Sequence, residues 1–128
     1  MIWEYDAKRL EGLEPSLARA VEVSLVAQAV EDEHGLICLY GYAGDLVGSD
    51  ARVWFYPMRS LDGYRVAFLR RCRRFISVLE SRYNVLYGTC AVGNAGIERW
   101  LRWLGFEPNG ETIAIGGREL WVFEKRRA

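Results

Sequence analysis

Residues 92–106 read VGNAGIERWLRWLGF. Gly93 and Asn94 interrupt the apolar run that precedes them, which predicts the end of a strand. After this break, apolar residues recur at the spacing of one helix face. They are Ile97, Trp100, Leu101 and Leu104. Gly105 follows at a position where helices commonly end, so the stretch predicts a short helix over residues 95–104 directly behind a strand.

The residues before this stretch predict another strand and a longer helix. Residues 84–92 have the composition of a buried strand. Between residues 63 and 83, apolar side chains repeat at steps of three and four, while arginines occupy the other faces. The apolar positions are Phe68, Cys72, Phe75, Ile76 and Leu79. We therefore expect a long amphipathic helix over residues 63–83.

The first half of the chain predicts three strands. Alternation of apolar and polar residues predicts a strand over 21–30, and the acidic cluster around Glu31 and Glu33 predicts a turn. Residues 36–43 are apolar on both faces, as in a covered strand, and residues 52–56 are rich in β-formers.

The two ends of the chain complete this pattern. Residues 5–20 contain Gly12 and Pro15, which limits them to one or two short helical turns. Residues 111–115 and 118–124 flank a glycine pair, as in a hairpin. We expect a single domain over residues 1–128 in the order β-β-β-α-β-α-β-β after a helical start, that is, an α/β (α+β) fold with a mixed, mostly antiparallel sheet flanked by helices.

Composition narrows the classes of function. Lys plus Arg and Asp plus Glu number 17 each, so no net charge draws the protein to nucleic acid. The arginines of the long helix could bind phosphates, but its aromatic residues belong to the apolar stripe, which favours a solvated face. His34 is the single histidine, and Cys38, Cys72 and Cys90 are far apart, so we expect no metal site and no disulfide framework. We expect neither a membrane span nor secretion.

Asn94 and the Leu104-Gly105-Phe106 triplet have the spacing found in acyl-CoA N-acyltransferases of the GNAT type. The chain resembles this family across the second half of its core, including the long helix before Asn94. The resemblance implies a GNAT-type sheet, acetyl-CoA as the acyl donor, and an amine as the acceptor.

A narrower resemblance covers nearly the whole chain. Glu14-Pro15-Ser16, Val53-Trp54, the arginine-rich helix and Val92-Gly93-Asn94 are similar to small GNAT-like proteins of short-tailed bacteriophages, one of them implicated in virion morphogenesis. This resemblance implies protein partners, either virion components or further copies of the chain. It also implies a location in the host cytoplasm and in the virion.

The turn that holds the cofactor pyrophosphate in active GNAT proteins is altered in this chain. Residues 56–64 read YPMRSLDGY, without the family's pair of small residues at the expected offset. Tyr56, Arg59, Gly63 and Tyr64, together with Asn94, would hold coenzyme A if it binds. Its pantetheine arm would then lie between diverging strands, near Tyr56 and residues 86–90. Asp62 precedes the helix, where a carboxylate caps the free amides that would otherwise meet a phosphate.

The family's usual proton donor is also missing. Many members carry a tyrosine seven residues after the Asn, and Leu101 stands there. Glu31, Glu33 and Asn94 are the remaining candidates for a catalytic role. We therefore expect a catalytically degenerate GNAT-fold protein of a phage, acting in virion structure or assembly through protein contacts. The alternative is an active acetyl-CoA-dependent N-acyltransferase that relies on positioning its substrates.

Overall fold

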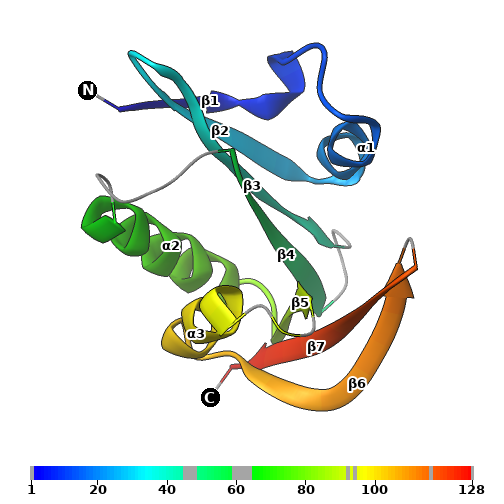
Figure 1. The fold of residues 1–128 in the computed structure, drawn as a ribbon. Coiled ribbons are helices and arrows are strands. Elements are labelled where there is room, and N and C mark those ends of the chain that lie inside the picture. Colours follow the sequence, from blue (N-terminus) through cyan, green and yellow to red (C-terminus); the bar gives the residue numbers. More distant parts are fainter. Residues whose placement is uncertain are drawn as a thin grey trace.

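The computed structural model describes residues 2–44, 49–58, 65–91, 93, 95–115 and 117–127, and they form one seven-stranded sheet with three α-helices (Figure 1). In chain order the elements are β1 (Trp3–Asp6), the 3-10 helix η1 (Ala7–Arg9), α1 (Pro15–Val23), β2 (Val26–Asp32), β3 (Gly35–Gly44), β4 (Asp50–Pro57), α2 (Arg65–Glu80), β5 (Val85–Ala91), α3 (Ala95–Trp103), β6 (Glu107–Ile115) and β7 (Arg118–Arg126). No helix among these described residues is long and apolar enough to cross a membrane.

The strand order is β1-β2-β3-β4-β5-β7-β6, and each neighbouring pair is antiparallel except β4 and β5. The parallel pair is possible because α2 carries the chain back across one face of the sheet between these two strands. The expected fold class, a mixed and mostly antiparallel sheet flanked by helices, is confirmed.

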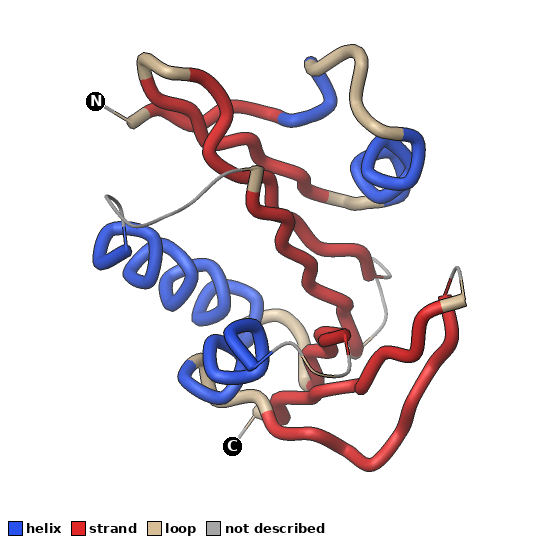
Figure 2. Tube along the Cα trace, in the orientation of Figure 1, coloured by secondary structure: helices blue, strands red, loops and turns tan. Residues whose placement is uncertain are grey.

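The helices divide between the two faces of the sheet. Figure 1 shows α2 and α3 together on one side and α1 on the other, beside the first strands. Figure 2 shows the β6–β7 hairpin at the end of the sheet opposite β1. The half of the sheet formed by β5, β7 and β6 therefore has a helix layer on its α2/α3 face and no described helix on the other.

The start of the chain differs from the sequence expectation. The strand expected over residues 21–30 begins at Val26, because α1 continues to Val23. Pro15 stands in the first turn, and the Glu14 carboxylate accepts hydrogen bonds from the Ser16 and Leu17 N–H groups, which together start a helix. Residues 3–6, read in part as helical, form edge strand β1.

Smaller differences concern where elements end. Strand β6 begins at Glu107, ahead of the expected residue 111, and a register shift between Pro108 and Thr112 interrupts its pairing with β7. Helix α2 ends at Glu80, three residues earlier than expected. The expected helix over 95–104 agrees with α3, and Gly105 follows it with φ of 97°, a conformation that glycine adopts readily.

The apolar core has its larger part between the sheet and α2/α3. Leu86, Leu101, Phe106 and Phe123 are almost completely buried there. A separate cluster under α1 contains Leu17, Val21, Ala29 and Leu39. Together these clusters fix the strands on which the candidate site is built.

Candidate functional site

A gap opens between the two parallel strands in the middle of the sheet. Strands β4 and β5 pair over three positions among the described residues: Asp50 with Val85, Ala51 with Leu86, and Arg52 with Tyr87. Beyond this apex, β4 stays paired with β3 as far as Pro57, while β5 stays paired with β7 as far as Ala91. Each strand therefore follows its other neighbour, and the two diverge.

The register of β4 directs backbone groups into this gap. The Met58 N–H donates to the Ile37 carbonyl at 2.9 Å, on the β3 side. Backbone polar groups alternate along an antiparallel strand, so the N–H and C=O of Val53 and Phe55 face the β5 side instead. Beyond the Arg52–Tyr87 pair, these groups are placed to bind the amides of an extended ligand.

Gly88 lies just beyond the apex, where α3 packs closely against β5. A methyl group at this position would lie 3.2 Å from Leu101 Cδ2 and 3.8 Å from Val53 Cγ2. Leu101 therefore already fills the space in front of Gly88, and a larger side chain would have to displace it.

An enclosed space, here named the inner cavity, lies beside β4 on the α2/α3 face of the sheet. Its volume is about 30 Å³, and its lining includes Val53 and Phe55 of β4, Cys72 and Ile76 of α2, and Trp100 and Leu104 of α3. The Phe55 ring lies 4.7 Å from Phe68 and 5.3 Å from Trp100, measured between ring centroids. Burial raises the pKa of the Cys72 thiol to about 12, which marks this side as dry.

The opposite face carries a wider depression, here named the outer hollow. Its volume is about 410 Å³, and it is lined by Val23, Ala43, Gly44, Asp50, Ala51, Arg52 and Tyr87. Trp54 shows which face this is, because its indole N–H donates to Ser24 Oγ at 2.7 Å, at the end of α1. Side chains alternate along a strand, so Arg52 shares the face of Trp54, and Tyr87 shares that of its partner Arg52.

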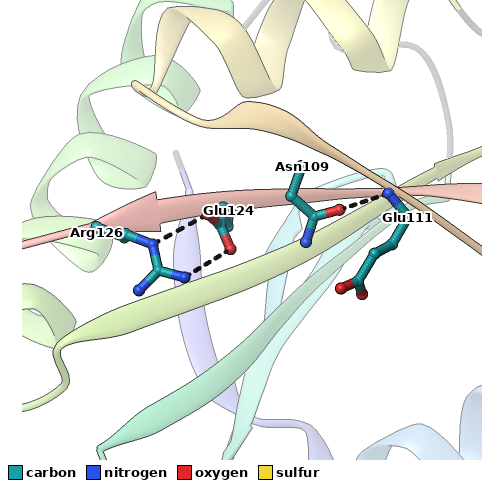
Figure 3. Close-up of polar contacts among 4 residues, drawn as sticks. All are labelled: Asn109, Glu111, Glu124 and Arg126. Carbon is teal, nitrogen blue, oxygen red and sulfur yellow. Dashed lines mark hydrogen bonds and ion pairs between the residues drawn. The ribbon is translucent and has the colours of Figure 1, made fainter.

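Strand β7 adds a charged pair beside the outer hollow (Figure 3). Arg126 donates to Glu124 through Nε, at 3.0 Å, and through Nη2, at 3.4 Å. These hydrogen bonds raise the pKa of Arg126, and the charge of Asp50 acts in the same direction. Because Glu124 lies opposite Tyr87 in the register, the pair extends the polar surface of the hollow along the sheet.

Figure 3 also shows the bend in β6. Asn109 Oδ1 accepts a hydrogen bond from the Glu111 N–H at 2.9 Å, within the segment where the register with β7 shifts. This local bond satisfies a donor that a regular ladder would have paired, and the edge strand is interrupted as a result.

The residues expected to hold coenzyme A are only partly described. Tyr56 lies on β4 beside the gap, on the face of Trp54, and is 45% exposed. Arg59, Gly63, Tyr64 and Asn94, as well as Asp62 of the expected cap, lie outside the described residues. Their role in binding stays a prediction.

The two glutamates proposed as bases lie away from the gap. Glu31 is on β2, two strands from β4, and accepts a hydrogen bond from the Tyr5 hydroxyl at 2.5 Å. Glu33 lies in the turn that follows β2, where its backbone N–H lowers its pKa and so weakens it as a base. The structure does not bring either residue to the β4–β5 apex.

Leu101, at the family's tyrosine position, is buried against the sheet and offers no proton donor. Asp50, Tyr87 and Gly88 surround the apex. Residues 86–90 were expected beside the pantetheine arm, whereas Asp50 was not singled out. The available signal for Asp50 was weak, because its importance follows from the parallel pairing of two strands that are separated by α2. Among the described residues, no group of three or more His, Cys, Asp or Glu could hold a metal ion.

Comparison with solved structures identifies the fold to which this arrangement belongs. An IAA acetyltransferase from Bacillus cereus superposes with a TM-score of 0.69 over 98% of each chain, at 10% identity. The spermidine N-acetyltransferase of Vibrio cholerae, in complex with CoA and spermine, gives a TM-score of 0.70 over 98% of this chain and 95% of that one, at 14% identity. This chain has the GNAT fold.

Further comparisons set the limits of this result. The ribosomal-protein-S5-alanine acetyltransferase of Vibrio fischeri shares the GNAT fold at a TM-score of 0.60 and 14% identity, over 88% of this chain and 67% of that one. No family model matches the sequence, and no curated protein matches it. At these identities the likeness shows the GNAT fold alone, and the chemistry has to be argued from the site.

Proposed function

We propose that this protein is an acyl-CoA-dependent N-acyltransferase. The observation that carries the proposal is the divergence of β4 and β5 beyond the Arg52–Tyr87 pair. The similar structures are of acetyltransferases, and one of them is a complex with CoA and spermine. These comparisons favour the active enzyme over the expected virion role, for which they give no support. Binding of protein partners stays a prediction.

The gap suits the pantetheine arm of coenzyme A. The arm carries amide groups, which match the donors and acceptors of Val53 and Phe55. The thioester would lie near Gly88, just beyond the apex, and Tyr56 lies farther along β4, toward the wider end of the gap. Coenzyme A would supply the activated acyl group, and the chain would hold it between the strands.

The outer hollow suits the acceptor amine. The exposed Asp50 carboxylate lies at the apex and attracts a cationic amine, while Tyr87 offers a hydroxyl on the same face. The cationic amine first loses one proton to water and attacks as the neutral amine. Acyl transfer then forms the amide N–C bond and breaks the C–S bond, and the second proton of the amine ends on the thiolate sulfur. Because Leu101 donates no proton, the rate depends mainly on the positioning of the two substrates.

The test is release of free thiol from acetyl-CoA in the presence of single amines, covering polyamines, lysine peptides and amino acids. We expect saturable turnover with at least one cationic amine, and mass spectrometry should show the acylated product. No turnover with any amine, combined with no binding of CoA, would favour the degenerate protein instead.

A further inference from the structure

We propose that the inner cavity receives the acyl chain of the donor, and that the preferred donor carries three or four acyl carbons instead of the two of acetyl. The inference rests on the proposed function, because it places coenzyme A in the β4–β5 gap. It adds the identity of the acyl group, which the fold leaves open.

The cavity borders the gap along β4. Val53 and Phe55 present their backbone groups to the gap and their side chains to the cavity. On the β5 side Leu101 packs closely against Gly88, where an added methyl group would lie 3.2 Å from Leu101 Cδ2. An acyl group attached to sulfur in the gap would therefore reach the cavity on the β4 side, past Val53 and Phe55.

The lining suits a hydrocarbon. Ile76, Phe55, Trp100 and Leu104 supply apolar surface. Arg71, the one charged residue among the described residues of the lining, has its guanidinium bound to Glu4 at 2.7 Å. An aliphatic chain that leaves water for such a surface gains affinity, whereas a charged acyl group would have to give up its hydration.

The volume sets the chain length. About 10–15 Å³ of such space accommodates one water-sized group, and a methylene is of similar size. The cavity of about 30 Å³ therefore takes about two carbons beyond the acetyl group. A six-carbon chain would have to displace Phe55 or Trp100, whose rings are already in contact.

The experiment is calorimetric titration of the full chain with CoA and with acetyl-, propanoyl-, butanoyl- and hexanoyl-CoA. Burial of each methylene is worth roughly a fourfold gain in affinity, so butanoyl-CoA should bind about fifteenfold more tightly than acetyl-CoA. Hexanoyl-CoA should bind more weakly than butanoyl-CoA.

Cys72 gives a matched pair of variants, because its side chain lines the cavity from α2. Cys72→Leu fills the cavity, so the fifteenfold preference for butanoyl-CoA over acetyl-CoA should fall to about one. Cys72→Ala enlarges the cavity, so the tightest-binding donor should shift toward hexanoyl-CoA. Val78→Ala, on the exposed face of the same helix, should leave the order of affinities unchanged.

CoA itself carries no acyl chain, so it separates the two proposals. Binding of CoA together with affinities that fall steadily from acetyl- to hexanoyl-CoA would overturn the acyl-chain assignment and leave the proposed function in place. Absence of binding by any of the five compounds would overturn both. An unchanged chain-length order in both folded Cys72 variants would also contradict the assignment, and Cys72→Ala alone decides this point if Cys72→Leu fails to fold.

Discussion

The two faces of the β4–β5 gap differ in almost every physical property. On the α2/α3 face the strands bound an enclosed cavity of about 30 Å³ with a mainly apolar lining. On the α1 face they bound an open hollow of about 410 Å³ that contains Asp50, Arg52 and Tyr87. Under the proposed function, shape would select the acyl group on one face and charge would select the amine on the other, with the bond-forming position between them.

The largest expected effect tests how dry the α2/α3 face is. Burial raises the pKa values of Cys38 and Cys72 to about 12, against about 9 for a free thiol. A raised pKa leaves less thiolate, so iodoacetamide at pH 8 should modify these two thiols about a thousandfold more slowly in the folded protein than in urea. Peptide mapping of the labelled cysteines measures this. Equal rates in both states would mean that the cavity is wet.

The next effect compares a glycine on each face. In Gly41→Ala, the new methyl group would lie 2.3 Å from the Val26 carbonyl oxygen, and the backbone cannot move away. We expect a loss of about 3 kcal/mol in the free energy of unfolding. In Gly88→Ala the main clash is with the flexible end of Leu101, so about 1 kcal/mol is expected. Urea denaturation of both variants checks the order, and a reversed order would contradict it.

A smaller effect tests the charge of the outer hollow. Asp50→Asn removes the carboxylate at the apex and should lower kcat/KM for a cationic amine by about fivefold, the range of an exposed ion pair. The effect should shrink at high salt. Glu33→Gln is the matched control, because that glutamate lies in the β2–β3 turn, away from the apex. A fall in kcat/KM in Glu33→Gln, but not in Asp50→Asn, would instead make Glu33 a catalytic candidate again.

The smallest effect concerns an unpaired group in the core of the α2/α3 face. Tyr83 is 1% exposed, and its hydroxyl has no hydrogen-bond partner among the described residues. Tyr83→Phe keeps the ring and removes the buried hydroxyl, so thermal unfolding should show a gain of about 1 kcal/mol. Tyr56→Phe, at an exposed position, should change stability little. A loss of stability in Tyr83→Phe would show that the hydroxyl is bound in solution.

The sequence predicted the parts of this account that depend on local periodicity. Helices α2 and α3 could be predicted because their apolar residues recur on one face over several turns. Helix α1 was missed in its last turn, because Val21, Val23 and Leu25 also alternate as a strand would. In the structure Glu14 caps the first turn of the helix, and the Ser24 hydroxyl donates to the Ala20 carbonyl in its last turn.

The candidate site was harder to predict than the fold. Tyr56 and residues 86–90 were expected beside the cofactor, but Asp50 meets Tyr87 at the apex through pairing between strands that are distant in the chain. Such a register depends on how α2 packs, which no short motif encodes. Glu31 and Glu33 attracted attention as acidic residues in a turn, yet the topology leaves β3 between them and β4.

The most direct test of the central claim is a crystal structure of the protein with CoA at saturating concentration. The account predicts the pantetheine arm between β4 and β5, hydrogen-bonded to the backbone of Val53 and Phe55, with its sulfur near Gly88. Density for CoA elsewhere on the surface, or strands that close over the gap and exclude it, would contradict the claim.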